Sequence, residues 1–315
     1  GIVAQSEQWH ELYDHLTKYG KHRMVAGDYG KYDKNMAAPF ILGAFDVLIS
    51  LSQSAGWSDD DLRVLRCIAY DTAFPTSDFH GDLIEMQGNP SGHPLTVIIN
   101  CIVNSLYMRY AYVITTGKSA LTFKDNVSLA TYGDDNAMSI KEGCDLFNHT
   151  SISKVLASIG VEYTMADKES ESIPFIHIDQ ISFLKRIFRW DEELKSYMAV
   201  LEEKSINKML TSYVDNGILA PEAHSVQAIE TALREYFFHG RERFEERKQY
   251  FKEIVCKAGL TDWVRDSTFP NFNQMAIDFW KRHITDNNAS IAVERIAYFS
   301  AAMGVNPPNL GENLQ

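Results

Sequence analysis

The sequence contains few cysteines, and none of them lie close together. Cys67, Cys101, Cys144 and Cys256 form no CxxC pair and no disulfide-like spacing. This scarcity argues against a disulfide-built secreted domain and fits reduced thiols in a cytoplasmic protein. Residues 1–5 also lack a basic segment followed by a long apolar run, so the sequence shows no signal peptide.

Basic residues are in short supply as well. There are 30 Lys and Arg residues against 42 Asp and Glu residues, which gives a formal net charge of −12. Nucleic-acid-binding proteins are usually basic, so this balance argues against a general binder unless the cations gather in a local channel. Low-complexity segments and internal repeats are absent too. The 315 residues, 45% of them hydrophobic, suffice for one large domain or two smaller ones with a sizeable core.

The most informative motif present is the tetrapeptide Tyr132-Gly133-Asp134-Asp135. The runs at 127–132 and 136–140 predict two strands, with Gly133 and Asp134 at the tip of a hairpin. Adjacent carboxylates repel each other, but they suit a divalent cation, which prefers oxygen ligands. For this pair taken alone, a solvated acidic turn is the alternative.

A second pair of acids follows a short buried strand that we predict at residues 23–27. Asp28 ends this strand, and Asp33 lies in the turn before an apolar helix that begins near Pro39. If the strand and the hairpin are neighbours in one sheet, their acids could clamp two Mg²⁺ ions about 3.5–4 Å apart, as in two-metal phosphoryl transfer. A helix-capping aspartate beside a solvated loop is the alternative here.

A glycine- and proline-rich loop at residues 87–95 precedes a long apolar helix. Thr96, Asn100 and Asn104 recur every four residues and form one polar stripe on that helix. Buried amides are costly unless they are bonded, so the stripe needs a polar partner or belongs to a satisfied core network. The two asparagines and Arg109 argue against a membrane span.

Hydrophobic periodicity and capping signals predict the remaining elements. The predicted helices cover residues 1–23, 39–52, 58–69, 145–159, 226–237 and 244–258. The predicted strands cover residues 83–86, 161–165 and 196–201, and residues 71–81 are predicted as a loop.

Together, these motifs resemble those of the RNA-directed RNA polymerases of picorna-like positive-strand RNA viruses. The matching segments follow the family's order across about residues 24–190: motif A at Asp28 and Asp33; motif B at Ser91, Gly92, Thr96 and Asn100; motif C at Tyr132-Gly133-Asp134-Asp135; motif D at Met165-Ala166-Asp167-Lys168; and motif E at Ile181-Ser182-Phe183-Leu184-Lys185-Arg186.

The resemblance implies an α+β fold, with a right-hand polymerase palm built on an antiparallel sheet and a mostly helical thumb. It divides the chain into a remnant of the fingers and palm entry (1–23), a palm (24–190) with a fingers insertion at about 50–90, and a thumb (191–315). Residues 1–27 show no dense Lys/Arg run of the kind that the family's fingers use to hold a triphosphate. The fingers are therefore expected to be largely missing, and the fragment alone is expected to be inactive.

The activity that the resemblance implies is template-directed addition of ribonucleotides to an RNA 3′ end, for viral genome replication. Two Mg²⁺ ions, for which Mn²⁺ can substitute, are expected at Asp28, Asp134 and Asp135. Lys168 is expected to protonate the pyrophosphate leaving group. The expected nucleotide-binding residues are Asp33, Ser91, Gly92, Thr96 and Asn100, and the expected RNA-binding residues are Lys185 and Arg186.

The expected partners are an RNA template, a primer or product strand, ribonucleoside triphosphates and other viral replication proteins. The expected location is the host cytoplasm, in replication complexes attached to membranes through those partners. Two alternatives stay open. One is a non-catalytic polymerase fragment or RNA-binding scaffold, and the other is a reverse transcriptase, which lacks the Ser91-Gly92, Thr96 and Asn100 pattern. Gln315 is a candidate polyprotein cleavage point, since related proteases favour glutamine before the cut.

Overall fold

The protein is described here from a computed structural model that covers residues 1–166, 170–214 and 217–308. Helices pack against antiparallel sheets, which confirms the predicted α+β class. The chain divides into two compact units, residues 15–184 and residues 1–14 with 185 onward. The boundary therefore falls a few residues before the predicted one at 190, and the first 14 residues join the C-terminal unit.

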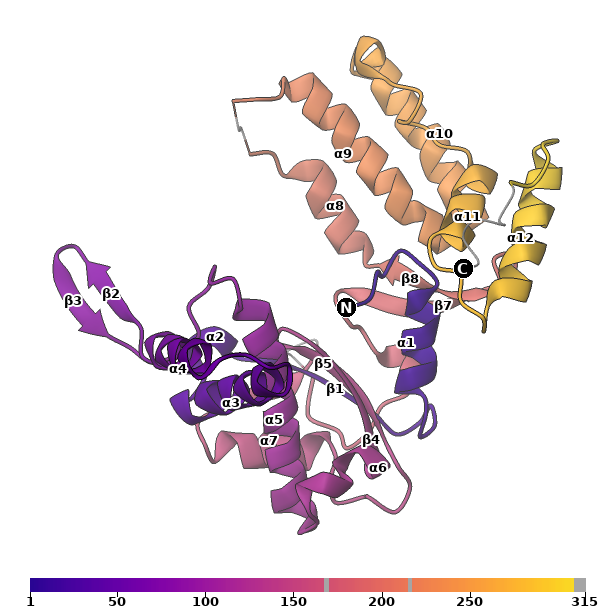
Figure 1. Ribbon diagram of the computed structural model, residues 1–315. Coiled ribbons are helices and arrows are strands. Elements are labelled where there is room, and N and C mark those ends of the chain that lie inside the picture. Colours follow the sequence, from indigo (N-terminus) through magenta and orange to yellow (C-terminus); the bar gives the residue numbers. More distant parts are fainter. Residues whose placement is uncertain (167–169, 215–216, 309–315) are drawn as a thin grey trace. The chain divides into compact units, whose positions relative to one another are not determined.

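The unit of residues 15–184 is built on a four-stranded antiparallel sheet with the strand order β4-β5-β1-β6 (Figure 1). Its strands are β1 (Met24–Tyr29), β4 (Val127–Tyr132), β5 (Asp135–Ile140) and β6 (Tyr163–Met165). β1 lies between β5 and β6, so segments that are more than a hundred positions apart in the chain become neighbours. This arrangement confirms that the hairpin and the first strand share one sheet.

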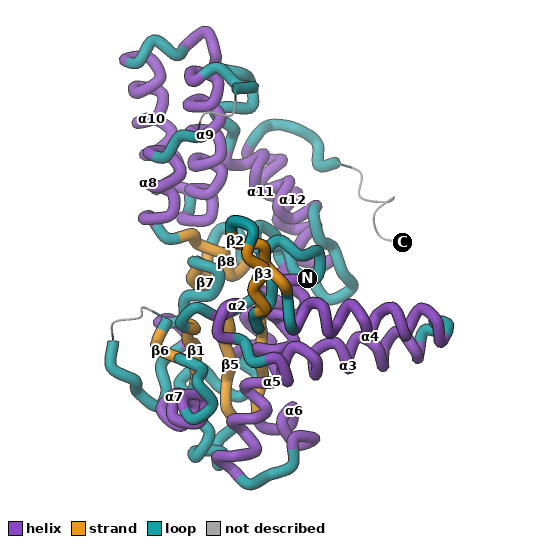
Figure 2. The backbone as a smooth tube through the Cα atoms, turned by 90° about the vertical axis from the view of Figure 1, so that its left-hand side faces the viewer, coloured by secondary structure: helices purple, strands orange, loops and turns teal. Residues whose placement is uncertain are grey.

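Helices cover the sheet and build the core of this unit. α5 (Thr96–Thr116) and α7 (His149–Ala157) pack on each other and on the strands, while α3 (Ala38–Ser54) and α4 (Asp59–Ala73) lie side by side (Figure 2). The short helices are α2 (Tyr32–Asn35), η1 (Ala120–Thr122), α6 (Phe123–Asn126) and η2 (Ile178–Gln180). The largest fully buried side chains of this core are Phe45, Tyr107, Tyr112, Phe123 and Phe147.

Within the described residues, α5 alone is long and apolar enough to span a membrane by length and composition. In this fold it is a core helix, because one side of it packs on α3, α7 and β4. Asn100 and Asn104 lie on that buried side, 7% and 0% exposed. Both buried amides need hydrogen-bond partners, and both have them in this unit.

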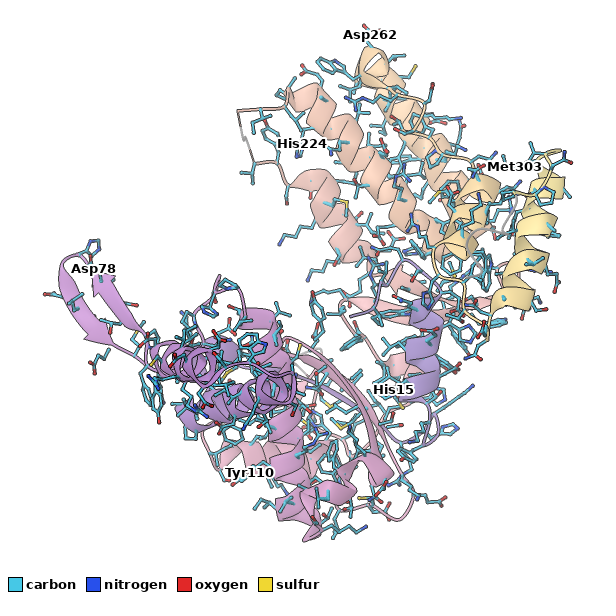
Figure 3. All side chains as sticks on the ribbon, viewed as in Figure 1. His15, Asp78, Tyr110, His224, Asp262 and Met303 are labelled. Carbon is cyan, nitrogen blue, oxygen red and sulfur yellow. The ribbon has the colours of Figure 1, made fainter. Side chains whose placement is uncertain are left out.

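The segment predicted as a loop at 71–81 is instead part helix and part hairpin. α4 continues to Ala73, and β2 (Thr76–Phe79) pairs with β3 (Asp82–Glu85) in a hairpin that stands out from the unit (Figure 1). Asp78 lies near its tip, where its carboxylate accepts a hydrogen bond from the Gly81 N–H at 2.7 Å (Figure 3). Cross-strand pairing stabilises these exposed residues, and it leaves little trace in hydrophobic periodicity.

Two predicted helices are shorter than expected, while the others form near their predicted limits. The helix predicted over 1–23 is α1 (Gln8–Leu16), after which the chain turns. The helix predicted over 145–159 begins only after Asn148, whose side chain accepts an N–H of the first turn and caps α7. The strand predicted over 161–165 likewise shortens to β6.

The second unit combines one hairpin, β7 (Arg186–Asp191) with β8 (Ser196–Leu201), and a set of helices. Trp9 and Tyr13 of α1 stack on Phe188 and Tyr197, with ring centroids 4.6 and 3.6 Å apart. The helices are α8 (Glu203–Thr211), α9 (Pro221–Tyr236), η3 (Phe237–His239), α10 (Arg241–Lys257), η4 (Thr261–Trp263), α11 (Phe272–Lys281) and α12 (Ala289–Ala302). The largest fully buried side chains of this core are Tyr236, Phe237, Phe244, Phe272, Trp280 and Phe299.

Candidate active site

The hairpin of β4 and β5 presents Asp134 to solvent at its tip. Tyr132 pairs with Asp135, which leaves a two-residue turn of Gly133 and Asp134. Gly133 has a φ of 62°, a left-handed conformation that costs glycine little. Asp134 is exposed, while Asp135 is half-buried at the start of β5. The turn is therefore the one predicted, with one accessible carboxylate and a second beside it.

The strand β1 brings Asp28 to the same end of the sheet. Gly27 pairs with Asn136 of β5, so the next positions along the two antiparallel strands are Asp28 and Asp135. On its other side Asp28 pairs with Thr164 of β6. Asp28 itself is half-buried. The sheet order thus joins the two acidic segments that the sequence separates.

These carboxylates fit a site that the substrate helps to complete. Among the described residues, no three His, Cys, Asp or Glu side chains form a ready-made metal cluster. The predicted trio of Asp28, Asp134 and Asp135 is therefore not assembled as a closed cage. Mg²⁺ is commonly held by one or two carboxylates together with substrate phosphates and water, and two carboxylates at adjoining strand ends suit that mode.

Asp33 is the centre of a second polar cluster. Its Oδ1 accepts from Asn100 Nδ2 at 2.7 Å, and its Oδ2 accepts from Ser91 Oγ at 2.9 Å. Asn89, which is 3% exposed, donates from Nδ2 to Asn100 Oδ1 at 2.7 Å. The structure thus brings Asp33, Ser91 and Asn100 together, with Asn89 behind them. Asn89 was not predicted, because nothing local distinguishes it from an ordinary loop asparagine.

The backbone of the glycine-rich loop is held against the short helix α2, in which the structure places Asp33 instead of the predicted turn. Gly88 has a φ of 131°, and a Cβ added there would lie 2.6 Å from the Asp33 carbonyl oxygen. The Asn89 N–H donates to that carbonyl at 3.0 Å. Thr96 Oγ1 lies 2.8 Å from the carbonyls of both Pro90 and His93, so it braces the loop. Exposed Gly92, with a φ of 89°, lies in the same loop.

A buried amide links the helix α5 to the acidic turn. Asn104 Nδ2 lies 3.2, 2.9 and 3.2 Å from the carbonyl oxygens of Gly133, Asp134 and Asp135. Asn104 Oδ1 accepts from the Tyr29 hydroxyl at 3.0 Å. The polar stripe predicted on α5 is therefore divided between two tasks, since Asn100 serves the Asp33 cluster and Asn104 serves the turn.

The three predicted basic residues have different outcomes. Lys168 lies outside the described residues. Lys185 is exposed just before β7. Arg186, however, is 8% exposed and forms a bidentate ion pair with Glu235, at 2.7 and 3.0 Å. Its guanidinium is thus enclosed in this pair, and the predicted contact of Arg186 with RNA stays a prediction.

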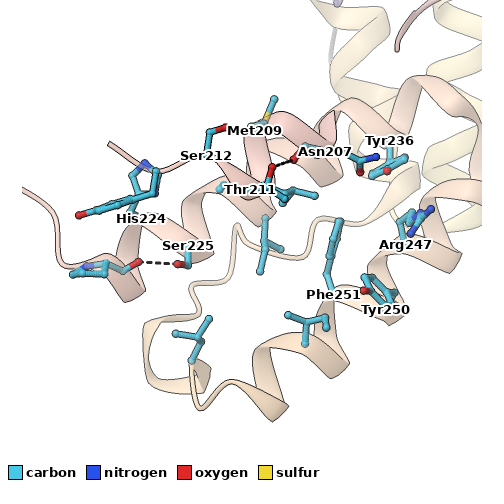
Figure 4. Close-up of a pocket in the computed structure, with 17 residues that line it drawn as sticks. Asn207, Met209, Thr211, Ser212, His224, Ser225, Tyr236, Arg247, Tyr250 and Phe251 are labelled. Carbon is cyan, nitrogen blue, oxygen red and sulfur yellow. Dashed lines mark hydrogen bonds between the residues drawn. The ribbon is translucent and has the colours of Figure 1, made fainter. Parts of the chain in front are cut away.

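A cavity of about 560 Å³ belongs to the other unit, among α8, α9 and α10 (Figure 4). Its lining is mostly apolar and aromatic, with Tyr236, Arg247, Tyr250 and Phe251 at one end. The described residues that line it include no Asp or Glu. The cavity therefore lacks the carboxylates on which the chemistry of the acidic turn depends.

Comparison with known proteins points in one direction. The family described as viral RNA-dependent RNA polymerase matches residues 1–255. The replicase polyprotein of Cricket paralysis virus is 29% identical over 283 residues, which are 85% of this chain and 16% of that polyprotein. That of Drosophila C virus is 30% identical over 260 residues, 78% of this chain and 15% of the polyprotein. The solved Sicinivirus 3Dpol RNA-dependent RNA polymerase has the same fold, with a TM-score of 0.65 at 17% identity over 82% of this chain and 51% of that one.

Proposed function

Because the chain belongs to the viral RNA-dependent RNA polymerase family, we propose that it catalyses template-directed addition of ribonucleotides to an RNA 3′ end. The observation that carries the proposal is the pairing of β1 with β5, which sets the strand of Asp28 beside the turn of Asp134. The Asp33 cluster on the same unit adds a polar site for the nucleotide. The partners are an RNA template, its growing product and ribonucleoside triphosphates.

In this proposal Asp28 and Asp134 hold two Mg²⁺ ions, with Asp135 assisting. When bound, the ions lower the pKa of the attacking 3′-hydroxyl and offset the charge of the triphosphate. The exposed position of Asp134 leaves it open to a phosphate-bound ion. Lys168 is assigned the role of proton donor to the pyrophosphate leaving group. Lys185, which is exposed, is assigned a contact to RNA phosphates. The activity is assigned to the host cytoplasm, beside other viral replication proteins.

Sugar recognition is assigned to the cluster around Asp33. Its carboxylate, the Asn100 amide and the Ser91 hydroxyl already bond to one another. A site of this kind can exchange such bonds for bonds to the ribose 2′-hydroxyl, whereas a deoxynucleotide leaves its polar groups without that partner. Thr96 and Gly92 act through the loop that carries Ser91.

The direct test is primer extension by the natural protein that carries residues 1–315, on an RNA template with Mg²⁺ and ribonucleotides. Template-dependent RNA synthesis supports the proposal. RNA binding without extension at any Mg²⁺ or Mn²⁺ concentration would favour the non-catalytic scaffold instead. A preference for deoxynucleotides would favour a reverse transcriptase.

Replacing Asn100 with alanine is expected to weaken sugar discrimination. The variant loses the donor to Asp33 and the acceptor for Asn89, so the ratio of kcat/KM for a nucleotide over its 2′-deoxy analogue should fall about tenfold, the equivalent of one lost hydrogen bond to a charged group. Asn148→Ala is the matched control, because it removes the cap of α7 and costs about 1 kcal/mol of stability without touching the cluster. An unchanged ratio in Asn100→Ala would mean that Asn100 has no part in sugar discrimination and serves only core packing.

A further inference from the structure

We propose that Asn104 is a positioning residue for the reaction, which, with Tyr29, holds the turn bearing Asp134 in place relative to the strand bearing Asp28. The inference rests on the proposed function, since it concerns the distance between two groups assigned to metal binding. Neither Asn104 nor Tyr29 belongs to the residues assigned above to metal, nucleotide or RNA.

The Asn104 side-chain NH2 group donates all of its hydrogen bonds to the acidic turn. Its two N–H groups face three consecutive carbonyl oxygens, of Gly133, Asp134 and Asp135, at 2.9 to 3.2 Å. Asn104 is 0% exposed, so water does not compete for these donors. Three bonds to successive peptide units restrain both the height and the tilt of the turn, which one bond could not do.

The acceptor side of the same amide is held by β1. The Tyr29 hydroxyl donates to Asn104 Oδ1 at 3.0 Å, and Tyr29 directly follows Asp28 in the chain. One amide therefore connects the backbone of the turn with the residue next to Asp28.

The residue type is the one that this geometry requires. A primary amide offers two donors and an acceptor, whereas aspartate can only accept and leucine can do neither. Cys101, one turn earlier on α5, adds a weaker contact, since its sulfur accepts the Gly133 N–H at 3.1 Å. The helix α5 thus contacts the acidic turn through two residues, Asn104 and Cys101, which lie one helical turn apart.

Position matters for the rate because the two carboxylates must hold their ions at a set spacing. A displacement of about 1 Å in a reacting assembly can lower the rate about a hundredfold. Charge stabilisation likewise depends on groups that are already in place before the reaction. If the acidic turn could move freely, the protein would keep its carboxylates and its affinity for the nucleotide, but its kcat would fall.

The test compares Asn104→Leu and Tyr29→Phe with Tyr112→Phe in the natural protein that carries residues 1–315. Tyr112 is a matched control on the same helix, because its buried hydroxyl also loses hydrogen bonds, to Thr122 and Asn126, without touching the turn. The readouts are kcat and KM for the nucleotide, the Mg²⁺ concentration for half-maximal rate, and amide hydrogen exchange across residues 129–138.

We expect kcat to fall about a hundredfold in Asn104→Leu and about fivefold in Tyr29→Phe, with KM for the nucleotide changed less than about threefold. Half-maximal rate should need more Mg²⁺, and exchange should quicken around the turn. Tyr112→Phe should leave kcat and the exchange of residues 129–138 unchanged. Equal losses in all three variants, or unchanged exchange at the turn in Asn104→Leu, would overturn the inference.

The exchange readout also separates this inference from the proposed function. If the unaltered protein makes no RNA under any condition, the proposed function fails. Exchange at residues 129–138 then still decides whether Asn104 holds the turn. If RNA is made and Asn104→Leu keeps its kcat, the function stands and the positioning role falls.

Discussion

Asp134→Asn is expected to abolish nucleotide addition and to leave folding intact. An amide of the same shape cannot supply the negative charge that holds Mg²⁺, and the loss of several kcal/mol of charge stabilisation corresponds to about a thousandfold or more in rate. Because Asp134 is exposed at the turn, the free energy of unfolding should change by less than about 0.5 kcal/mol. The measurements are primer extension and urea denaturation.

Asp78→Asn is the matched control for this experiment. Asp78 is also an exposed aspartate close to the turn of a hairpin in the same unit, where its carboxylate accepts the Gly81 N–H. Asparagine can accept the same bond, so the control should keep both rate and stability. Near-normal extension by Asp134→Asn would remove Asp134 from the proposed metal site, and with it the main support for the mechanism.

Arg186→Met is expected to destabilise the protein strongly, by about 3–5 kcal/mol, because it leaves the Glu235 carboxylate buried without its cation. Arg186 and Glu235 are each 8% exposed. Their carboxylate–guanidinium bonds are 2.7 and 3.0 Å long, and Arg186 also donates to the Ala199 carbonyl at 2.9 Å. Urea denaturation measures the loss of stability: the midpoint of unfolding should shift to a lower urea concentration, while the dependence of the unfolding free energy on urea stays the same.

Two further variants identify the cause. Adding Glu235→Leu to Arg186→Met removes the stranded charge and should recover much of the lost stability, since apolar replacement of a buried ion pair is often close to neutral. Lys185→Met, at the exposed neighbouring position, should change stability by less than about 0.5 kcal/mol and instead weaken RNA binding. If Arg186→Met stayed fully stable and bound RNA poorly, the predicted contact of Arg186 with RNA would be supported.

The acidic hairpin was predictable because its signals are local. Period-two apolar runs flank a glycine, and Gly133 indeed adopts the positive φ that the turn requires. The start of α4 was equally local, because Ser58 and Asp61 cap each other within three positions of the chain. Elements that depend on such short-range signals formed close to their predicted limits.

The role of Arg186 was not predictable in this way. From the sequence alone, adjacent lysine and arginine residues are both predicted to be exposed cations. In the structure Lys185 is exposed, whereas Arg186 is buried. The difference arises from Glu235, which lies 49 positions later in the chain. Tyr29 escaped prediction for the same reason, because its partner Asn104 lies 75 positions later in the chain. Asn89 escaped prediction because its partner Asn100 gains its role only through Asp33, 67 positions away from Asn100.

The sequence by itself determined the parts: the strands and turn that carry Asp134, the strand that carries Asp28, the helix α5 with its polar stripe, and the order of motifs that identifies the family. These follow from backbone preferences and apolar periodicity within a few residues. Only the tertiary structure decided that β1 lies beside β5, that Asn104 bridges the two acidic segments, and that Arg186 is enclosed. Those outcomes depend on which distant surfaces pack together, because burial and hydrogen-bond satisfaction are settled by the whole core and not by any one segment.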